Sequence, residues 1–477
     1  MTRGFSSDRQ QGVRIKFNRL SRKICFSIPA FLVFFLACAQ TAAAYIDPGS
    51  GGYLIGSIIA MIGGFFAVAS AFLIHFFRNI IGKAIRIFWN KHRILSILIV
   101  GAAALVTGVL AYRFFYEPAV GKFNPSLSGA HIRDAAKVFP GYNLYEGKLM
   151  DLEGKLVKKW SSVNLGTLDT NGDYYAQKYF EAPVWGKYTW DDKVVWEKNF
   201  PIHHEILLTP KGTIITFTKE VHEYQGRNVE FDVILEFDTN GKELQAFSFW
   251  DHLKEFQKYH AKLELDMPPT FVIPETHRKT KSVWGGNYDY YHLNSLSIIP
   301  ENSMAGKHAA FRPGNWLVAF RHGSIIFIMD QDTKKVLWRA VYTQVKDRLE
   351  GPHTPSMLPD GNILLFDNGR YRKWSRVLVI DPVTLKVVWE YRGKNFYTLS
   401  QGSVQRLPNG NLLVTEAEEG HVFEITPDKR KVWEFYHPEK QGDKDQAEKK
   451  KWGRRREIYR MTRYPKEMID RVLAVGK

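Results

Sequence analysis

Histidines recur at one place in a repeated unit of this chain, directly before a short apolar segment. His203 and His204 precede "EILLTPKGTIITF", His292 precedes "LNSLSIIPEN", and His353 precedes "TPSMLPDGNILLF". The corresponding place in the last copy, "SQGSVQRLPNGNLLV", has no histidine. Because a residue needed only for packing should recur in most copies, we interpret these histidines as candidates for a functional site.

The copy that holds His292 also carries Arg321, which ends the apolar segment "NWLVAF". Imidazole and guanidinium groups together suit a sulfate or phosphate group. A neutral imidazole is a nucleophile near pH 7, and arginine binds anionic oxygens through a planar fork of donors. Three histidines are also a common ligand set for zinc. The permanent charge of Arg321 would repel a divalent metal, so we expect an anion site and no metal.

These side chains must be positioned by a β-rich repeat that begins near Phe123. Its copies are short alternating strands joined by Asp-Gly or Asn-Gly turns, and Trp338, Trp389 and Trp433 recur at spacings of 51 and 44 residues. A period of this length, with about four strands in each copy, is typical of propeller blades. We therefore predict an all-β fold, a six-bladed β-propeller over residues 117–436, whose innermost strands converge on a central channel.

Three apolar segments precede the predicted propeller, at residues 24–44, 53–77 and 94–112. The first follows basic residues and ends in alanines, so residues 1–44 are either a signal peptide or a first transmembrane helix. The other two are long enough to span about 30 Å of hydrocarbon, which predicts a membrane region at residues 45–116 and two or three N-terminal transmembrane helices in all. The basic segment at 78–93 predicts a cytoplasmic loop, and hence a propeller on the side of the membrane opposite the cytoplasm.

The net charge of +17 is concentrated in a few segments. Residues 1–23 carry seven Lys or Arg against one acid, and residues 437–477 carry thirteen against seven acids. Apart from these and the loop at 78–93 the chain is close to neutral, so we expect no nucleic-acid partner. The basic C-terminal tail is expected to pack on the propeller. Cys25 and Cys38 both lie in the first apolar segment, which excludes a disulfide framework or thiolate zinc site from the propeller.

Four stretches, in order, make the chain similar to a known family. They are "HHEILLTPKGTIITF", "YYHLNSLSIIPEN", "LVAFRHGSIIFIMD" and "GPHTPSMLPDGNILLFDNG", and they resemble the bacterial PAPS-independent arylsulfotransferases. The likeness covers roughly residues 140–465, including "YRMTRYPKEM" near the C-terminus. It implies a six-bladed propeller that moves a sulfuryl group from an aryl sulfate ester to a phenol, by a ping-pong mechanism through a sulfohistidine intermediate. It implies no cofactor.

Carried over residue by residue, the resemblance implies that His353 is the nucleophile. His292 and Arg321 match the residues that bind and stabilise the transferring group. One of His203 and His204 matches the remaining active-site histidine, and the sequence leaves open which one.

Asn294 and Tyr291, which lie beside His292 in the sequence, are further candidates for substrate binding. The chain departs from the family at Pro352-His353-Thr354, where members often have Gln-His-Asp. The orientation of the nucleophile is therefore expected to depend on a different neighbour.

Two classes of function stay open at the level of sequence. One is the sulfotransferase, and the other is a non-catalytic ligand-binding or scaffolding propeller anchored on the outer face of the inner membrane. A phenol pocket would need aromatic walls, for which the candidates are Tyr290, Tyr291, Trp284, Tyr371 and Trp374. The residues leave open the natural sulfate donor and acceptor and the oligomeric state.

Overall fold

The structure is a computed structural model of the chain. It describes residues 89–92, 94–95, 97–98, 102, 105–107, 127–161, 165–178, 184–260, 283–286, 288–341, 343–439 and 455–475. The chain divides into two compact units, Met1–Leu110 and Ala111–Lys477. The apolar segments at 24–44 and 53–77 lie outside the described residues, and the segment at 94–112 is described only in part. Among the described residues, no helix is both long and apolar enough to cross a membrane. The transmembrane helices therefore stay a prediction.

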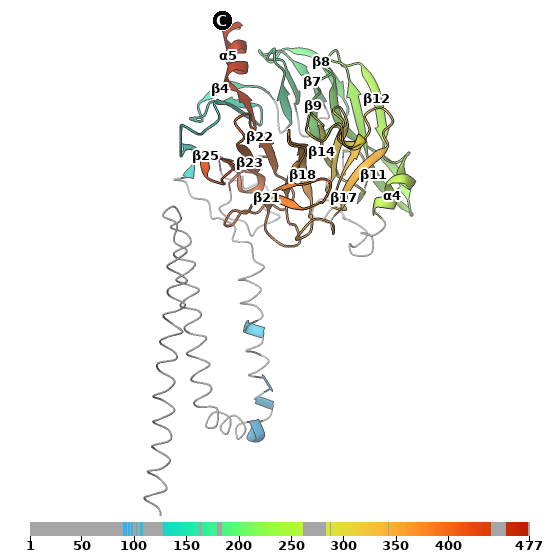
Figure 1. The fold of residues 1–477 in the computed structure, drawn as a ribbon, viewed down its shortest axis with the longest axis vertical. Helices are drawn as coiled ribbons and strands as arrows, with labels where there is room; N and C mark the ends of the chain where they lie inside the picture. The colour runs from blue at the N-terminus through green and yellow to red at the C-terminus, as the bar shows by residue number, and fades with distance from the viewer. Residues whose placement is uncertain are drawn as a thin grey trace, which may run out of the picture. The chain divides into compact units, whose positions relative to one another are not determined.

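The second unit is an all-β, six-bladed β-propeller, which confirms the fold predicted from the repeat. First strands of consecutive blades contact one another around the centre, and Figure 1 shows β9, β14, β18 and β22 toward the middle of this unit. From the centre outward, blade 1 consists of β26 (Thr462–Pro465), β2 (Gly141–Tyr145), β3 (Lys148–Met150) and β4 (Leu156–Lys159), and blade 2 consists of β5 (Gly166–Leu168), β6 (Tyr174–Gln177), β7 (Val184–Tyr188) and β8 (Val194–Asn199). Blade 3 consists of β9 (His203–Leu208), β10 (Ile214–Tyr224), β11 (Arg227–Phe237) and β12 (Glu243–Ser248), and β13 (Tyr288–Asp289) pairs with β11.

Blades 4 to 6 follow the same order. Blade 4 consists of β14 (Leu293–Ile298), β15 (Trp316–Phe320), β16 (Ile325–Met329) and β17 (Val336–Val341), and blade 5 consists of β18 (Pro352–Met357), β19 (Ile363–Asp367), β20 (Arg376–Ile380) and β21 (Val387–Tyr391). Blade 6 consists of β22 (Ser403–Arg406), β23 (Leu412–Glu416), β24 (His421–Ile425) and β25 (Lys431–Tyr436), with β1 (Gly129–Ile132) outermost. Short helices lie outside the sheets at α4 (Leu253–His260), η3 (Ala309–Phe311), η4 (Ala417–Glu419) and α5 (Lys466–Val475).

The middle strands of blades 4 and 5 show why these segments are nearly continuous apolar runs. Every residue of β15, β16, β19 and β20 is buried. Each blade packs one face on the preceding blade and the other on the following blade, so alternation between apolar and polar residues is lost in the middle of the sheet. The resulting clusters join neighbouring blades: one of them contains Ile326 and Ile328 of blade 4 with Leu365 and Leu378 of blade 5.

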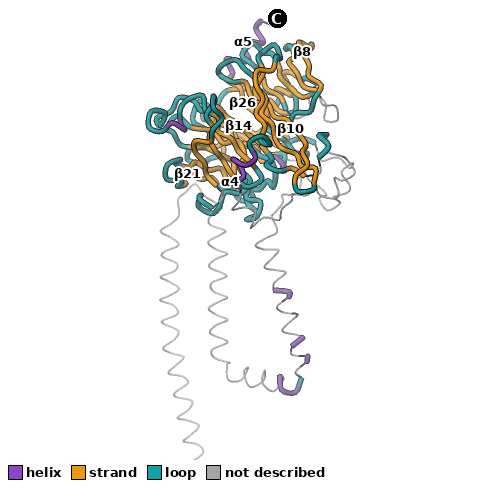
Figure 2. Tube along the Cα trace, turned by 90° about the vertical axis from the view of Figure 1, so that its right-hand side faces the viewer, coloured by secondary structure: helices purple, strands orange, loops and turns teal. Residues whose placement is uncertain are grey.

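Both ends of the propeller sequence take part in closing the ring. The C-terminal tail supplies β26, the innermost strand of blade 1, so the propeller extends beyond its expected end at residue 436. Arg463 of β26 forms a fully buried ion pair with Glu424 of blade 6, and its Nε donates to Oδ1 of Asn143 in blade 1 at 2.8 Å. The tail is therefore part of the fold rather than a covering layer, and Figure 2 shows β26 among the strands with α5 at the C-terminus.

Tryptophans at the outer strands link one blade to the next. In each case the indole N–H donates to a backbone carbonyl in a turn of the following blade. The pairs are Trp160 to Trp190, Trp196 to Thr239, Trp338 to Pro382, Trp389 to Pro427 and Trp433 to Leu152, at 2.7 to 3.0 Å. The tryptophan repeat seen in the sequence is thus explained by contacts between blades.

Candidate active site

The candidate histidines lie at the start of the innermost strands of three consecutive blades. His203 and His204 begin β9, His292 directly precedes β14, and His353 is the second residue of β18. In these blades the register between the first two strands shifts beside the histidine, whereas the first two strands of the other three blades pair without a shift. A β-bulge bends its strand and re-aims a side chain. The bulges therefore distinguish the blades that carry the site from those that do not.

His353 is 5% exposed, and its own strand fixes its imidazole. Its Nδ1–H donates to the carbonyl oxygen of Gly351 at 3.0 Å, which leaves the lone pair on Nε2. Burial, and next the Arg321 guanidinium, lower the pKa of His353 to about 3. The side chain is therefore neutral at pH 7, which is the form that can act as a nucleophile.

Thr354 holds the bulge that follows this histidine. Its φ is 44°, a left-handed conformation that costs a residue other than glycine about 1 to 2 kcal/mol. Its backbone N–H donates to Oγ of Ser295 at 2.8 Å, and its own Oγ1 accepts from the N–H of Val404 at 3.0 Å. Threonine thus ties together the first strands of blades 4, 5 and 6, and positions His353 by hydrogen bonds where the family often has an acidic neighbour.

Arg321 follows β15 and reaches the same group of imidazoles. Its backbone N–H donates to the carbonyl of His292 at 3.1 Å, and its Nη1 donates to Nε2 of His322 at 3.5 Å. Nδ1–H of His322 in turn donates to the carbonyl of Asp289 at 3.1 Å. Burial, and next Arg370, lower the pKa of Arg321 to about 10, so the guanidinium stays charged at neutral pH. His322 therefore orients the arginine.

The carboxylate of Asp289 binds the imidazole of His292 and fixes its orientation. Its Oδ2 lies 2.5 Å from Nδ1 of His292 and 2.8 Å from Nζ of Lys219, which also lies 3.3 Å from Glu230. Although burial raises the pKa of Asp289, Lys219 and His292 hold it well below its ordinary value. Burial lowers the pKa of His292, and Asp289 opposes that effect. The carboxylate can therefore compensate an imidazolium when Nε2 of His292 takes up a proton.

The structure distinguishes the two adjacent histidines of β9. The ring of His204 lies 4.7 Å from that of His292 and 6.2 Å from that of Tyr459. His203 packs edge-on against Trp284 at 5.5 Å, and its Nδ1 lies 2.8 Å from Nδ1 of His204. His204 is therefore the histidine of this pair that lies next to His292, and His203 contacts His204 from the side of Trp284.

Asp289, His292 and His322 place possible ligand atoms within 4.8 Å of one another, which is the spacing of a metal site. The atoms concerned already contact cations, however. Nζ of Lys219 lies 2.8 Å from Oδ2 of Asp289, and Nη1 of Arg321 lies 3.5 Å from Nε2 of His322. Both cations would repel a divalent ion. The residues do not fit a metal, and we assign none.

Asn294 and Tyr291 are fully buried and support the site from within the blades. Nδ2 of Asn294 donates to the carbonyl of Pro352 at 2.8 Å, and its Oδ1 accepts from Oγ of Ser295 at 3.0 Å. Tyr291 stacks on Phe320 with ring centroids 4.5 Å apart. The contacts of both residues are structural, and their role in substrate binding stays a prediction.

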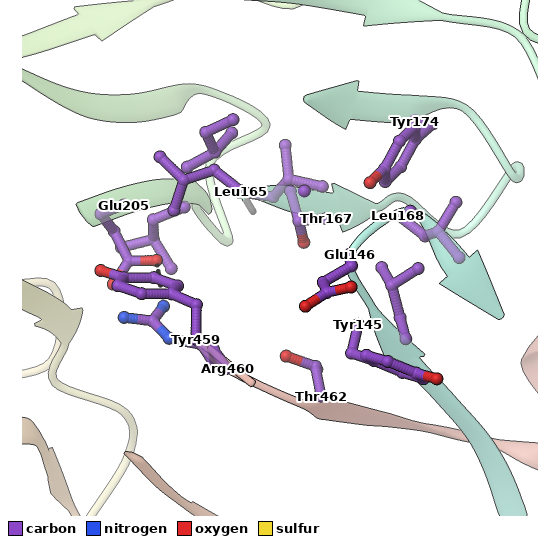
Figure 3. Close-up of a pocket in the computed structure, with 16 residues that line it drawn as sticks. Tyr145, Glu146, Leu165, Thr167, Leu168, Tyr174, Glu205, Tyr459, Arg460 and Thr462 are labelled. Carbon is purple, nitrogen blue, oxygen red and sulfur yellow. Dashed lines mark hydrogen bonds and ion pairs between the residues drawn. The ribbon is translucent and has the colours of Figure 1, made fainter. Parts of the chain in front are cut away.

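A cavity of about 340 Å³ lies between the first strands of blades 1, 2 and 3, beginning one residue along β9 from His204. Figure 3 shows how its side chains are arranged, with the ion pair between Glu205 and Arg460 on one side at 2.7 Å. The hydroxyl of Tyr459, which lines the cavity, donates a hydrogen bond to the carbonyl of His204 at 3.3 Å. The cavity therefore lies next to the strand that carries the two histidines. Its walls include leucines and the labelled Tyr145, Glu146, Tyr174, Glu205, Tyr459 and Thr462.

Of the aromatic residues expected from the sequence to form a phenol pocket, Trp284 lies against His203, whereas Tyr290 and Trp374 pack against other residues. Tyr290 stacks on Phe231 at 5.0 Å, and Trp374 lies between the guanidinium groups of Arg372 and Arg392. Among the described residues that line the cavity beside His204, the aromatic ones are tyrosines of other segments.

Sequence reasoning missed four charged or titratable residues of this region. Asp289 lies three positions before His292, and His322 directly follows Arg321, so both could have been found by their nearness to predicted residues. Lys219 and Asp232 lie within strands β10 and β11. Both strands carry further charged residues, so no signal in the sequence alone set these two apart.

Comparison with known proteins gives one clear result. The arylsulfotransferase (ASST) family model matches residues 152–438, more than half of the chain. No curated protein matches. Solved structures with a similar fold include a protein of unknown function from Bacteroides caccae, with 11% identity, 68% of this chain and 98% of that chain covered and a TM-score of 0.39. Another is a catalytically inactive virginiamycin B lyase from Staphylococcus aureus, with 11% identity, 65% and 74% covered and a TM-score of 0.32. The family match, together with the propeller, shows that the chain belongs to the arylsulfotransferase family.

Proposed function

We propose that the chain is a sulfotransferase that moves a sulfuryl group from an aryl sulfate ester to a phenol, through a sulfohistidine at His353. One observation carries the proposal: a buried neutral imidazole, with its Nδ1–H engaged by Gly351, lies under the electrostatic influence of the permanently charged Arg321. Membership of the arylsulfotransferase family supports the reaction class.

In the first half-reaction, Nε2 of His353 attacks sulfur in line with the leaving phenolate, and an N–S bond forms as the S–O bond breaks. The guanidinium of Arg321 binds the sulfuryl oxygens and stabilises their negative charge. This charge also favours protonation of His292, whose Nε2–H then donates to a sulfuryl oxygen while Asp289 compensates the imidazolium. If sulfuryl transfer has a loose transition state like that of phosphoryl transfer, positioning and electrostatics supply most of the rate.

His204 is the residue best placed to protonate the phenol oxygen, because its ring lies 4.7 Å from that of His292 and 6.2 Å from that of Tyr459, which lines the cavity. It would protonate the leaving phenolate and later deprotonate the acceptor. The two phenols occupy the same position in opposite directions of one reaction, so one cavity suffices for both aryl groups. Its volume of about 340 Å³ and its tyrosine and leucine walls suit an aromatic ring.

We also propose that the enzyme is held at a bacterial inner membrane with the propeller on the periplasmic side. The support is the two long apolar segments at 53–77 and 94–112 and the basic segment at 78–93 between them. A reporter that is active only in the cytoplasm, fused to the C-terminus, should stay inactive. Activity of that reporter would contradict this topology.

The reaction is tested with a chromogenic aryl sulfate, in the presence and absence of a phenol acceptor. We expect release of the chromophore beyond one equivalent per chain to depend on the acceptor, and His353→Asn to abolish release. Continued release beyond one equivalent without acceptor would indicate a hydrolase. A folded wild-type chain that binds several aryl sulfates but releases nothing would contradict the proposal and support the alternative, a ligand-binding propeller.

A further inference from the structure

Behind the two histidines of β9 lies a carboxyl group that the mechanism above does not use. Asp232 of β11 is fully buried, and its Oδ1 lies 3.4 Å from Nε2 of His203. Its Oδ2 accepts a hydrogen bond from the backbone N–H of Leu293 at 3.0 Å. Leu293 directly follows His292, so Asp232 is fixed against the first strands of both blades 3 and 4.

A continuous series of polar atoms leads from this carboxyl toward the site. Oδ1 of Asp232 faces Nε2 of His203, and Nδ1 of His203 lies 2.8 Å from Nδ1 of His204. Nε2 of His203 also lies 3.3 Å from the carbonyl of Thr218. An imidazole can accept a proton on one nitrogen while it gives one up from the other. The terminal atom of the series is therefore Nε2 of His204.

We propose that Asp232 holds the proton that the two half-reactions exchange, and that His203 and His204 relay it between Asp232 and the phenol oxygen. The inference rests on the proposed function and adds a proton store to it. Asp232 touches no substrate, so it is a positioning residue that acts through the two histidines.

In the donor half-reaction the proton moves outward. Nε2–H of His204 goes to the oxygen of the leaving phenolate, the proton on Nδ1 of His203 moves to Nδ1 of His204, and the carboxyl proton of Asp232 moves to Nε2 of His203. The products are the sulfurylated His353, a neutral phenol and the Asp232 carboxylate. Nε2–H of His203 then donates to the Thr218 carbonyl and faces the carboxylate.

In the acceptor half-reaction each step reverses. The hydroxyl proton of the incoming phenol goes to Nε2 of His204, the relay returns one proton to Asp232, and the phenol oxygen takes the sulfuryl group as the N–S bond breaks. Both relay histidines start and finish each half-reaction as neutral imidazoles. The balance needs no proton from solvent, which suits a buried site.

The surroundings of Asp232 agree with this role. The charged and titratable groups that face it are Lys219 of β10, Glu230 of β11, Asp289 of β13 and His203 of β9. Burial raises the pKa of Asp232 to about 8 against the opposing effect of Lys219. Burial also lowers the pKa values of His203 and His204 well below the ordinary value. Both shifts favour a protonated carboxyl and uncharged imidazoles at neutral pH.

The first test compares leaving groups in single-turnover experiments without acceptor. Asp232→Asn should slow the release of a phenol that needs protonation, such as unsubstituted phenol, by about 100-fold. It should change the release of 4-nitrophenolate, which leaves without a proton, by less than about threefold. Glu230→Gln is the matched control, because it removes a buried carboxylate 3.3 Å from Lys219 that is not in the relay, and it should keep the wild-type ratio of the two rates. Equal slowing of both leaving groups in Asp232→Asn, or of neither, would overturn the relay.

A second measurement needs no variant. Infrared difference spectra of the wild-type chain should show the band of a protonated carboxyl disappear when phenyl sulfate reacts, and return when acceptor is added. Mass spectrometry of the same sample reports the sulfuryl group on His353. Sulfurylation without loss of the carboxyl band would overturn the relay alone, whereas absence of sulfurylation would contradict the proposed function.

Discussion

Acid should destabilise the propeller partly because His353 is kept neutral in the native protein. The pKa of His353 falls from 6.5 to about 3 on folding, because the side chain is buried and lies near Arg321. Between these values the unfolded chain binds a proton that the native protein does not bind. The stability that depends on the neutral form is therefore fully present above pH 6.5 and is lost progressively as the pH falls toward 3.

The size of the effect follows from these two values. Lowering the pH from 7 to 5 should reduce the free energy of unfolding by about 2 kcal/mol through His353 alone. Other buried histidines add to the loss in the wild-type chain but are also present in His353→Asn. The loss measured for the wild type minus the loss measured for the variant should thus be about 2 kcal/mol.

Urea unfolding at both pH values, followed by tryptophan fluorescence, measures this difference. Ser295→Ala is a matched control, because it removes a hydroxyl beside the same strand without removing a titrating group, and its loss should equal that of the wild type. Equal losses in the wild type and in His353→Asn would refute the reasoning. They would mean that folding does not keep this imidazole neutral.

Three further predictions follow from individual contacts. Arg321→Gln should lower the rate of the donor half-reaction by about 10² to 10³, measured as burst release of a chromogenic phenol, because a charge on the sulfuryl oxygens loses its partner. A smaller loss than tenfold would contradict the role of the arginine. Glu424→Gln should lower the free energy of unfolding by about 3 to 5 kcal/mol, measured in urea, because it leaves the buried Arg463 uncompensated where the ring closes. Thr462→Trp should fill part of the cavity and raise KM for naphthyl sulfates relative to phenyl sulfates by about tenfold, and an unchanged ratio would place the aryl group elsewhere.

The repeat allowed the fold to be predicted and candidate residues of the site to be selected. Comparison of copies within one chain separated His353 from the ordinary blade residues that follow it, and the structure places it with Arg321 and His292 at bulged strands. Only the structure showed that the ring of His204 lies next to that of His292 and that His203 contacts His204 through its Nδ1.

Other features depend on contacts between segments that are distant in the sequence. Asp232 becomes a neighbour of His203 only when β9 and β11 are in one blade, and Leu293 fixes it from the next blade. The segment "TRYP" is too short to show strand alternation, so its place as the innermost strand of blade 1 was not predicted. Asn294 lies two residues after His292 in the sequence, yet its side chain donates a hydrogen bond to the carbonyl of Pro352 in the next blade.

The central claim is that His353 carries the sulfuryl group. Its most direct test is mass spectrometry of the full chain after brief reaction with an aryl sulfate in the absence of acceptor, followed by peptide mapping under conditions that preserve an N–S bond. We expect one added sulfuryl group, on the peptide that contains His353, which disappears when a phenol is added. A modified peptide that lacks His353, or acceptor-dependent transfer in His353→Asn, would contradict the account.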